Sequence, residues 1–207
     1  MRGMTSSTAT SPFLLTDESL DVLFREARTA NTFTDEPVSA EQVREVWDVV
    51  RFGPTAMNNQ PLRLLLVQSA EARERLAAHM AGNNRPKTRT APLTAVLAAD
   101  VDFHELLPRH FPHAPGVRDA LHPDAEGRAA QAEFNAALQI GYLILGLRAA
   151  GLATGPMAGF DKAGVDAEFL GGTSWRSVLV MNIGRPGPDA WADRLPRLSF
   201  DDAARVV

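Results

Sequence analysis

The hydrophobic and polar positions along the chain predict four helices. Apolar side chains recur at helical spacing over Asp17–Arg28 and again after Ser39, which opens a capping-box sequence, Ser-Ala-Glu-Gln. The second helix is expected to end before Gly53, and a third is expected over Ala70–Met80. The fourth, Arg128–Ala150, is apolar on almost every side, which predicts a helix buried on most of its faces.

Short aliphatic runs predict three buried strands, Leu62–Gln68, Pro92–Ala99 and Ser174–Ile183. Asp102–Glu126 is rich in Pro, His and Gly and has no clear period, so we expect an irregular excursion of a functional or mobile kind. The last segment, Pro186–Val207, carries large apolar side chains that need burial, for which a partner subunit is one place.

Composition narrows the class of protein. A chain of 207 residues suffices for one substantial core, so we expect a single domain over residues 16–207 after a disordered leader at 1–15. The net charge of -4 disfavours nucleic-acid and membrane partners. The absence of cysteine excludes disulfides and thiolate chemistry. The leader lacks the apolar stretch of a signal peptide, so a cytoplasmic location is expected.

Three loops carry groups suited to a polar, phosphorylated ligand. Gly53–Pro61 concentrates Thr, Asn and Gln side chains, although an ordinary Asn-rich turn has the same composition. Ala27–Phe33 combines a guanidinium with hydroxyl and amide groups, which suits a phosphate or, alternatively, an arginine at a helix C-terminus. Gly155–Asp161 has glycine near both ends, which would let the backbone approach a flat ligand or would simply connect two elements.

Four of the five histidines lie in the irregular excursion: His104, His110, His113 and His122. Their spacing matches no zinc motif, so we expect no metal, and a histidine-cluster metal-binding module is kept as an alternative. The chain has no nucleophile elbow, no Walker loop and no Gly-x-Gly-x-x-Gly after a strand. Hydrolase and Rossmann functions are therefore unsupported.

Taken together and in this order, the loops resemble the nitroreductase superfamily of FMN-binding enzymes. Arg28-Thr29 resembles its Arg-Ser motif, Pro54–Pro61 its Pro-Ser-x-x-Asn-x-Gln-Pro loop, and Pro156–Asp161 its Pro-x-x-Gly-Phe-Asp loop. With Gly82–Thr88 and Arg194–Asp201 added, the pattern is similar to the RutE-type branch of the family. Members of that branch are malonic semialdehyde reductases, also called 3-hydroxypropionate dehydrogenases.

The resemblance implies an α+β fold of the nitroreductase type, with an antiparallel-rich sheet flanked by helices and a C-terminal segment exchanged in a homodimer. It implies FMN as cofactor and NADPH or NADH as hydride donor, with flavin N5 carrying the hydride and no catalytic side chain. Lys87 would give electrostatic support to the reduced flavin. The cofactor-binding residues that it implies are Arg28, Thr29, Asn31, Pro54, Thr55, Ala56, Asn58, Gln60, Asn84, Lys87, Pro156, Met157, Ala158, Gly159 and Arg197.

The implied reaction is reduction of malonic semialdehyde to 3-hydroxypropionate in pyrimidine degradation. The alternatives are a broad-specificity nitro, quinone or enone reductase and a non-catalytic flavin carrier. By the same resemblance, Pro54 to Asn58 reach the FMN of the other subunit. A cation or an amide is needed to hold the substrate carboxylate, and Arg109, Arg118 or a histidine of the excursion could do this.

Overall fold

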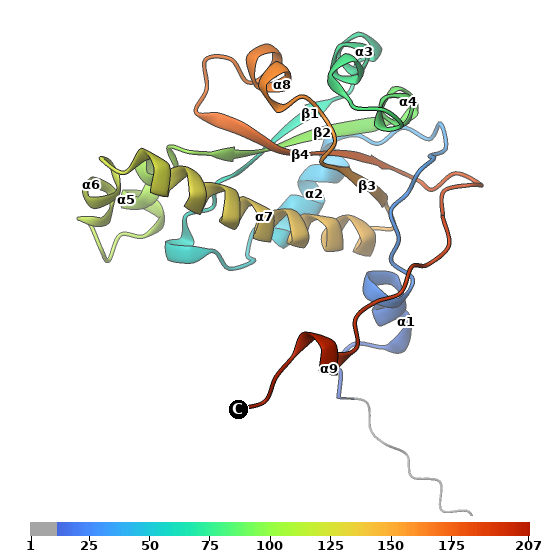
Figure 1. The fold of residues 1–207 in the computed structure, drawn as a ribbon, viewed down its shortest axis with the longest axis horizontal. Coiled ribbons are helices and arrows are strands. Elements are labelled where there is room, and N and C mark those ends of the chain that lie inside the picture. The colour runs from blue at the N-terminus through green and yellow to red at the C-terminus, as the bar shows by residue number, and fades with distance from the viewer. Residues whose placement is uncertain (1–11) are drawn as a thin grey trace, which may run out of the picture.

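The computed structural model describes residues 12–207, and residues 1–11, which form most of the expected leader, lie outside the described residues. Four strands form one sheet in the order β1-β2-β4-β3, and every neighbouring pair is antiparallel. The strands are β1 (Leu62–Val67), β2 (Leu93–Asp100), β3 (Ala153–Met157) and β4 (Trp175–Gly184). Helices cover both faces of the sheet (Figure 1). The predicted α+β class and antiparallel sheet are confirmed.

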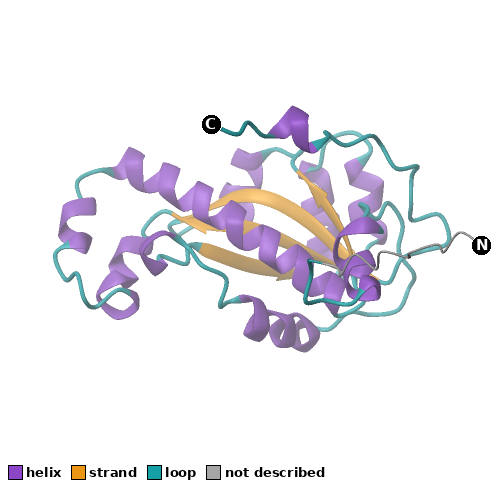
Figure 2. Ribbon diagram, turned by 90° about the horizontal axis from the view of Figure 1, so that it is seen from below, coloured by secondary structure: helices purple, strands orange, loops and turns teal. Residues whose placement is uncertain are grey.

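The sheet is the middle layer of three. Every residue of the central strand β2 is buried, and its side chains alternate between two cores. Leu97 points to a core shared with α2 (Ala40–Val50) and α7 (Ala125–Ala149), and Val96 to a core shared with α3 (Ala70–His79) and α8 (Lys162–Phe169). Figure 2 shows α7 lying across the strands.

The helix α2 begins at the predicted capping box. The Ser39 hydroxyl accepts from the Gln42 N–H at 3.2 Å, and the Gln42 side chain accepts from the Ser39 N–H at 2.8 Å. α2 packs closely on α7, because Gly146 of α7 leaves room for Val50 where a β-carbon would come within 2.3 Å of its side chain. The sequence pattern thus set both the start of α2 and its buried face.

Within one chain, α7 is buried along one face only, so the expectation of burial on most faces is wrong. Its buried side chains recur at helical spacing as Ala132, Asn135, Ala136, Gln139, Ile140, Leu143 and Leu147. The opposite face leaves Phe134 66% and Leu138 38% exposed. The apolar character of α7 therefore exceeds what its own chain covers.

The N-terminal helix is shorter than predicted. α1 (Asp17–Leu20) passes into the π-helical turn η1 (Asp21–Arg25), which ends three residues before the expected Arg28. The Glu26 N–H bonds to the Asp21 carbonyl at 2.9 Å, a wide turn that closes the helix there. Residues 26–31 are consequently free to form a loop.

The sequence predicted an irregular segment over Asp102–Glu126, but the structure has a series of short helices there. These are η3 (Phe103–Leu106), α5 (Leu107–His110) and α6 (Val117–Leu121), after which α7 begins at Ala125. Each spans about one turn, which is too short for an apolar period to be visible in the sequence.

The strand β3 was predicted as part of a loop, because Gly155 and Pro156 are typical of turns. β3 lies at an edge of the sheet, where proline is tolerated since only one side of the strand is paired. Three further short helices were not predicted: α4 (Asn84–Thr90), α8, whose N-cap is Asp161, and α9 (Phe200–Ala203).

The C-terminal segment leaves the body of the molecule. It passes α1 and ends at α9, away from the sheet (Figure 1). Leu195, Leu198 and Phe200 are 72%, 76% and 73% exposed. Across residues 12–207, no helix has the length and apolar character needed to cross a bilayer.

Candidate functional site

Three of the segments singled out in the sequence meet at one corner of the molecule. The Lys87 ammonium of α4 donates to the Asn31 side-chain oxygen at 2.7 Å. The Asn84 side chain of the same helix donates to the Gly159 carbonyl at 3.1 Å. α4 therefore joins the loop at residues 28–31 to the loop that follows β3, and Asn84 rather than the exposed Asn83 faces that loop.

Gly155 and Gly159, in the segment that the sequence singled out after α7, have different roles. A β-carbon on Gly155 would lie 2.7 Å from the Ala30 carbonyl, and the Ala30 N–H bonds to the Thr154 carbonyl at 2.9 Å. Gly155 thus serves backbone packing, and its expected approach to a ligand stays a prediction. Gly159 stands beside Asn84 at the corner, where a β-carbon would meet the Asn84 nitrogen at 3.0 Å.

Beside this corner, the first loop and the C-terminal segment enclose a pocket of about 180 Å³. Its polar lining comprises Arg28, Thr29, Asn31, Asp193, Arg194 and Arg197. The Arg28 Nε is buried and has no hydrogen-bond partner. Leaving a buried donor unpaired costs about 1–3 kcal/mol, more for a charged group, and an anion in the pocket would remove that cost. Guanidiniums and a hydroxyl together form a chemically suitable phosphate site.

Arg194 was not assigned to the site from the sequence. Its guanidinium donates to the Ala27 carbonyl at 3.4 Å and lies 3.8 Å from Glu26. In the described part of the chain, the Arg197 guanidinium donates only to the carbonyls of Leu195 and Pro196. In the sequence, the one indication that Arg194 belongs to the site was its position three residues before Arg197. Among residues 12–207, Arg194 has one ion pair, at 3.8 Å, and Arg197 has none, so both guanidiniums are available to an anionic ligand.

The turn at Pro54–Gln60 lies elsewhere. It follows α2 and lies beneath α7 on the left of Figure 1, whereas α4 and α1 lie on the right. Met57, Asn58 and Gln60 adopt φ angles of 52°, 50° and 44°, a left-handed conformation that is uncommon outside glycine. Such strain clusters at functional sites. Asn59, which the sequence reasoning left unassigned, is fully buried with both side-chain polar atoms unpaired.

Polar residues on one face of α7 hold this turn, and none was given that role from the sequence. They are Asn135, Gln139 and Tyr142, at positions i, i+4 and i+7. In the same order, their partners are the Ala56 N–H at 2.8 Å, the Leu62 N–H at 2.9 Å and the Pro54 carbonyl at 3.0 Å. These hydrogen bonds from α7 hold the strained turn and the start of β1 in place.

Replacing Asn135 with alanine is expected to destabilise the protein by about 1–3 kcal/mol, because the Ala56 N–H loses its partner. Urea unfolding measures the change. Glu133→Ala, on the exposed side of the same helix, is the control and should change stability by less than about 0.5 kcal/mol. Equal effects of the two variants would show that Asn135 does not support the turn.

The excursion approaches the turn through the Asn58 side chain, which donates to the His110 carbonyl at 2.9 Å. Burial, followed by the charge of Arg109, lowers the pKa of His110. Within residues 12–207, Arg109 itself is exposed and makes no hydrogen bond or ion pair. Arg118 is instead held by Glu105 at 2.7 Å and by Asp119 at 2.8 Å. Of the two candidate arginines, only Arg109 is free to bind a substrate.

Comparison with known sequences identifies the family of the chain. The family model described as Nitroreductase family matches residues 24–185. The chain belongs to the Nitroreductase family. A Streptomyces griseus relative, provisionally named NADH dehydrogenase/NAD(P)H nitroreductase, is 58% identical over 187 residues, which cover 90% of this chain and 95% of the relative.

Solved structures show the same nitroreductase fold. A provisionally named nitroreductase of Exiguobacterium sibiricum, in complex with FMN, matches with a TM-score of 0.77 and 21% identity over 93% of this chain and 98% of its own. An enone reductase of gut-bacterial fatty acid saturation matches with a TM-score of 0.78 and 15% identity over 94% of this chain and 100% of its own. The nitroreductase-type fold expected from the sequence motifs is confirmed, whereas the exchange of the C-terminal segment in a homodimer stays a prediction.

Proposed function

We propose that this nitroreductase-family chain binds FMN at the corner between residues 28–31, α4 and the loop after β3, and uses NAD(P)H to reduce a small molecule. The observation that carries the proposal is the pocket with Arg28, Arg194 and Arg197, in which a buried guanidinium nitrogen has no partner. The FMN complex of the Exiguobacterium neighbour and the NAD(P)H nitroreductase name of the Streptomyces relative support it.

Each residue of the corner would contact a different part of the flavin. The arginines of the pocket would hold the phosphate, and Asn84, fixed by Gly159, would lie at the edge of the ring. Lys87, held by Asn31, would place a positive charge where electrons accumulate on reduction. The exposed backbone of Ala158 would donate a hydrogen bond to the ring. Bound flavin supplies the hydride chemistry, so no side-chain nucleophile is needed.

A homodimer completes this proposal. The strained turn at Pro54–Gln60 shares no hydrogen bond with the corner residues of its own described chain, which fits a turn directed at the partner's cofactor. Val49 of α2 and Phe52, just after it, are 74% and 79% exposed, and an open groove of about 350 Å³ lies along α2 and the end of α7. An obligate interface of about 2,000–5,000 Å² would cover these surfaces.

The substrate that we propose is malonic semialdehyde, reduced to 3-hydroxypropionate in pyrimidine degradation, as the sequence resemblance implies. Arg109 supports this choice, because an unpaired guanidinium beside the turn at Pro54–Gln60 would bind the substrate carboxylate. A second candidate is reduction of an enone, the activity named for the enone reductase of the same fold, and an uncharged enone serves as its test substrate.

The visible spectrum of the purified protein before and after anaerobic addition of NADPH tests the proposal. We expect one FMN per chain, loss of flavin absorbance with NADPH, and its return on adding malonic semialdehyde. Bound flavin that NADPH cannot reduce would indicate a flavin carrier instead. Absence of flavin binding, with or without added FMN, would contradict the cofactor assignment.

Changing Arg109 to alanine should separate the two substrates. A charge-assisted hydrogen bond contributes about 1.5–3 kcal/mol, so KM for malonic semialdehyde should rise about 10–100-fold while turnover of an uncharged enone is retained. Arg109→Lys should recover part of the loss. Steady-state kinetics with both substrates measures this. An equal loss with both would remove Arg109 from carboxylate binding.

A further inference from the structure

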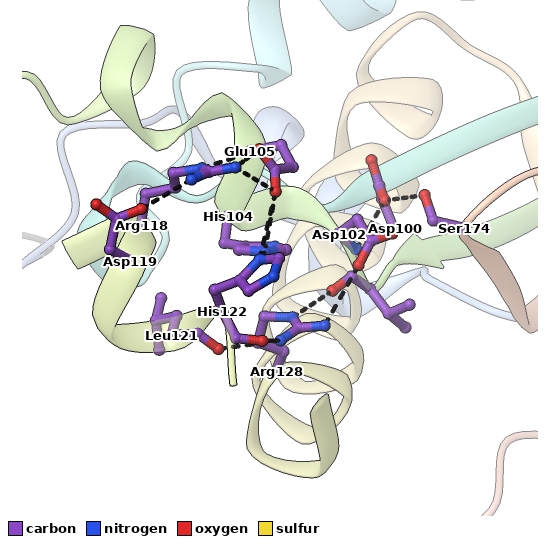
Figure 3. A network of polar contacts seen from close by, with 11 residues as sticks. Asp100, Asp102, His104, Glu105, Arg118, Asp119, Leu121, His122, Arg128 and Ser174 are labelled. Atoms are coloured by element: carbon purple, nitrogen blue, oxygen red, sulfur yellow. Dashed lines mark hydrogen bonds and ion pairs between the residues drawn. The ribbon is translucent and has the colours of Figure 1, made fainter. Parts of the chain in front are cut away.

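Two histidines and a glutamate of the excursion meet away from the proposed cofactor corner. His104 and Glu105 belong to η3, and His122 directly follows α6. The His104 Nε2 lies 3.1 Å from the His122 Nδ1 and 3.3 Å from the Glu105 Oε1, and the last two atoms are 3.7 Å apart. Figure 3 shows the three side chains turned toward one another.

These distances are those of ligands around one small cation. Metal bonds of about 2.0–2.2 Å at tetrahedral angles place neighbouring ligand atoms about 3.3–3.6 Å apart. A hydrogen bond between the two imidazoles would account for the 3.1 Å distance between their nitrogens. It would leave the Glu105 Oε1, 3.3 Å from His104 Nε2 and 3.7 Å from His122 Nδ1, without a strong hydrogen bond to either ring, whereas one cation explains all three distances.

Neighbouring groups fix the ligands in place. Arg118 binds Glu105 mainly through Oε2, at 2.7 and 2.9 Å, with a contact of 3.0 Å to Oε1, so that Oε1 also faces the imidazoles. Arg128 binds the carbonyls of Leu121 and His122 and anchors the end of α6. Hydrogen-bond partners of this kind orient the side chains that bind a metal.

Charge and access are also compatible with a cation. The guanidiniums of Arg118 and Arg128 contact three carboxylates, those of Asp102, Glu105 and Asp119, so these paired groups together carry a negative charge. The His104 side chain is 2% exposed, whereas those of Glu105 and His122 are 44% and 63% exposed. The triangle is therefore anchored on one side and open to solvent on the other, which leaves a fourth position for water.

We propose that His104, Glu105 and His122 bind a zinc(II) ion that fastens the end of α6 to η3. Two imidazoles and one carboxylate suit zinc better than calcium or magnesium, which prefer oxygen ligands. By joining residues 104 and 122, the ion would close a loop of the chain that contains Arg109 and His110. The site would thus steady the segment that lies against the turn at Pro54–Gln60.

Zinc titration of the chelator-treated full-length protein against a chromophoric competitor tests the site. We expect one zinc per chain and, at about 100 times the Kd, a rise in Tm of about 5–10 °C. His122→Asn and Glu105→Gln, both at exposed positions, should fold without zinc, bind it at least 10-fold more weakly and lose the rise in Tm. His113→Asn, on the same excursion but outside the triangle, is the control and should bind zinc as the wild type does.

Several results would overturn the assignment. If zinc fails to bind stoichiometrically, the two histidines form only a hydrogen-bonded pair. If His122→Asn keeps wild-type affinity, or if His113→Asn loses affinity as much as His122→Asn, the ion lies elsewhere. None of these measurements depends on flavin or on turnover, so they stand apart from the test of the proposed activity.

Discussion

Removal of residues 198–207 is expected to yield a monomer that no longer retains FMN, although every residue lining the phosphate pocket is still present. The deletion begins after Arg197 and removes Leu198, Phe200 and α9, whose apolar side chains are largely exposed in the single chain. In the proposed dimer they are buried on the partner. Without them, the turn at Pro54–Gln60 would no longer be held at the partner's cofactor, and both properties would fail together.

Sedimentation velocity followed at 280 nm and in the flavin band measures assembly and cofactor together. A shorter deletion, of residues 205–207, is the control, because it leaves α9 intact and should remain dimeric and yellow. A truncated monomer that still carries FMN would show that the site is not shared. A truncated dimer would show that the tail is dispensable for assembly.

The parts of the fold that could be predicted are those whose cause is local. The capping box at Ser39 and the aliphatic runs of β1, β2 and β4 specify their elements within a few residues. β3 could not be predicted, because Gly155 and Pro156 are chosen by contacts with Ala30 and by its place at the sheet edge rather than by strand propensity. Its identity as a strand is a tertiary property.

The same division holds for the candidate site. Motifs that are contiguous in sequence pointed to Arg28, Asn31 and Lys87, and the structure places Lys87 against Asn31. Asn135 gave no such signal, because a buried amide on a helix resembles a polar interruption until the turn that it holds is seen. His104 and His122 were discounted as ligands on their sequence spacing, yet the short helices between them bring their ring nitrogens together.

Arg28→Ala is expected to weaken FMN binding about 10–100-fold, and Arg28→Ala combined with Arg197→Ala about 10²–10⁴-fold, since each charge-assisted phosphate contact contributes about 1.5–3 kcal/mol. Riboflavin has the same ring but no phosphate, so its affinity should change little in either variant. Fluorescence titration of the apoprotein with FMN and with riboflavin separates the two contributions.

Arg25→Ala provides a matched control for this pair. Arg25 lies one turn before the loop, and it is held by Asp21 at 2.9 Å and Asp17 at 3.0 Å, outside the pocket. Its loss should leave FMN affinity within about twofold of the wild type, because an exposed ion pair contributes little. If the Arg28 and Arg197 variants weaken riboflavin as much as FMN, the arginines act on the fold of the loop rather than on the phosphate, and the cofactor would then have to be oriented with its phosphate elsewhere.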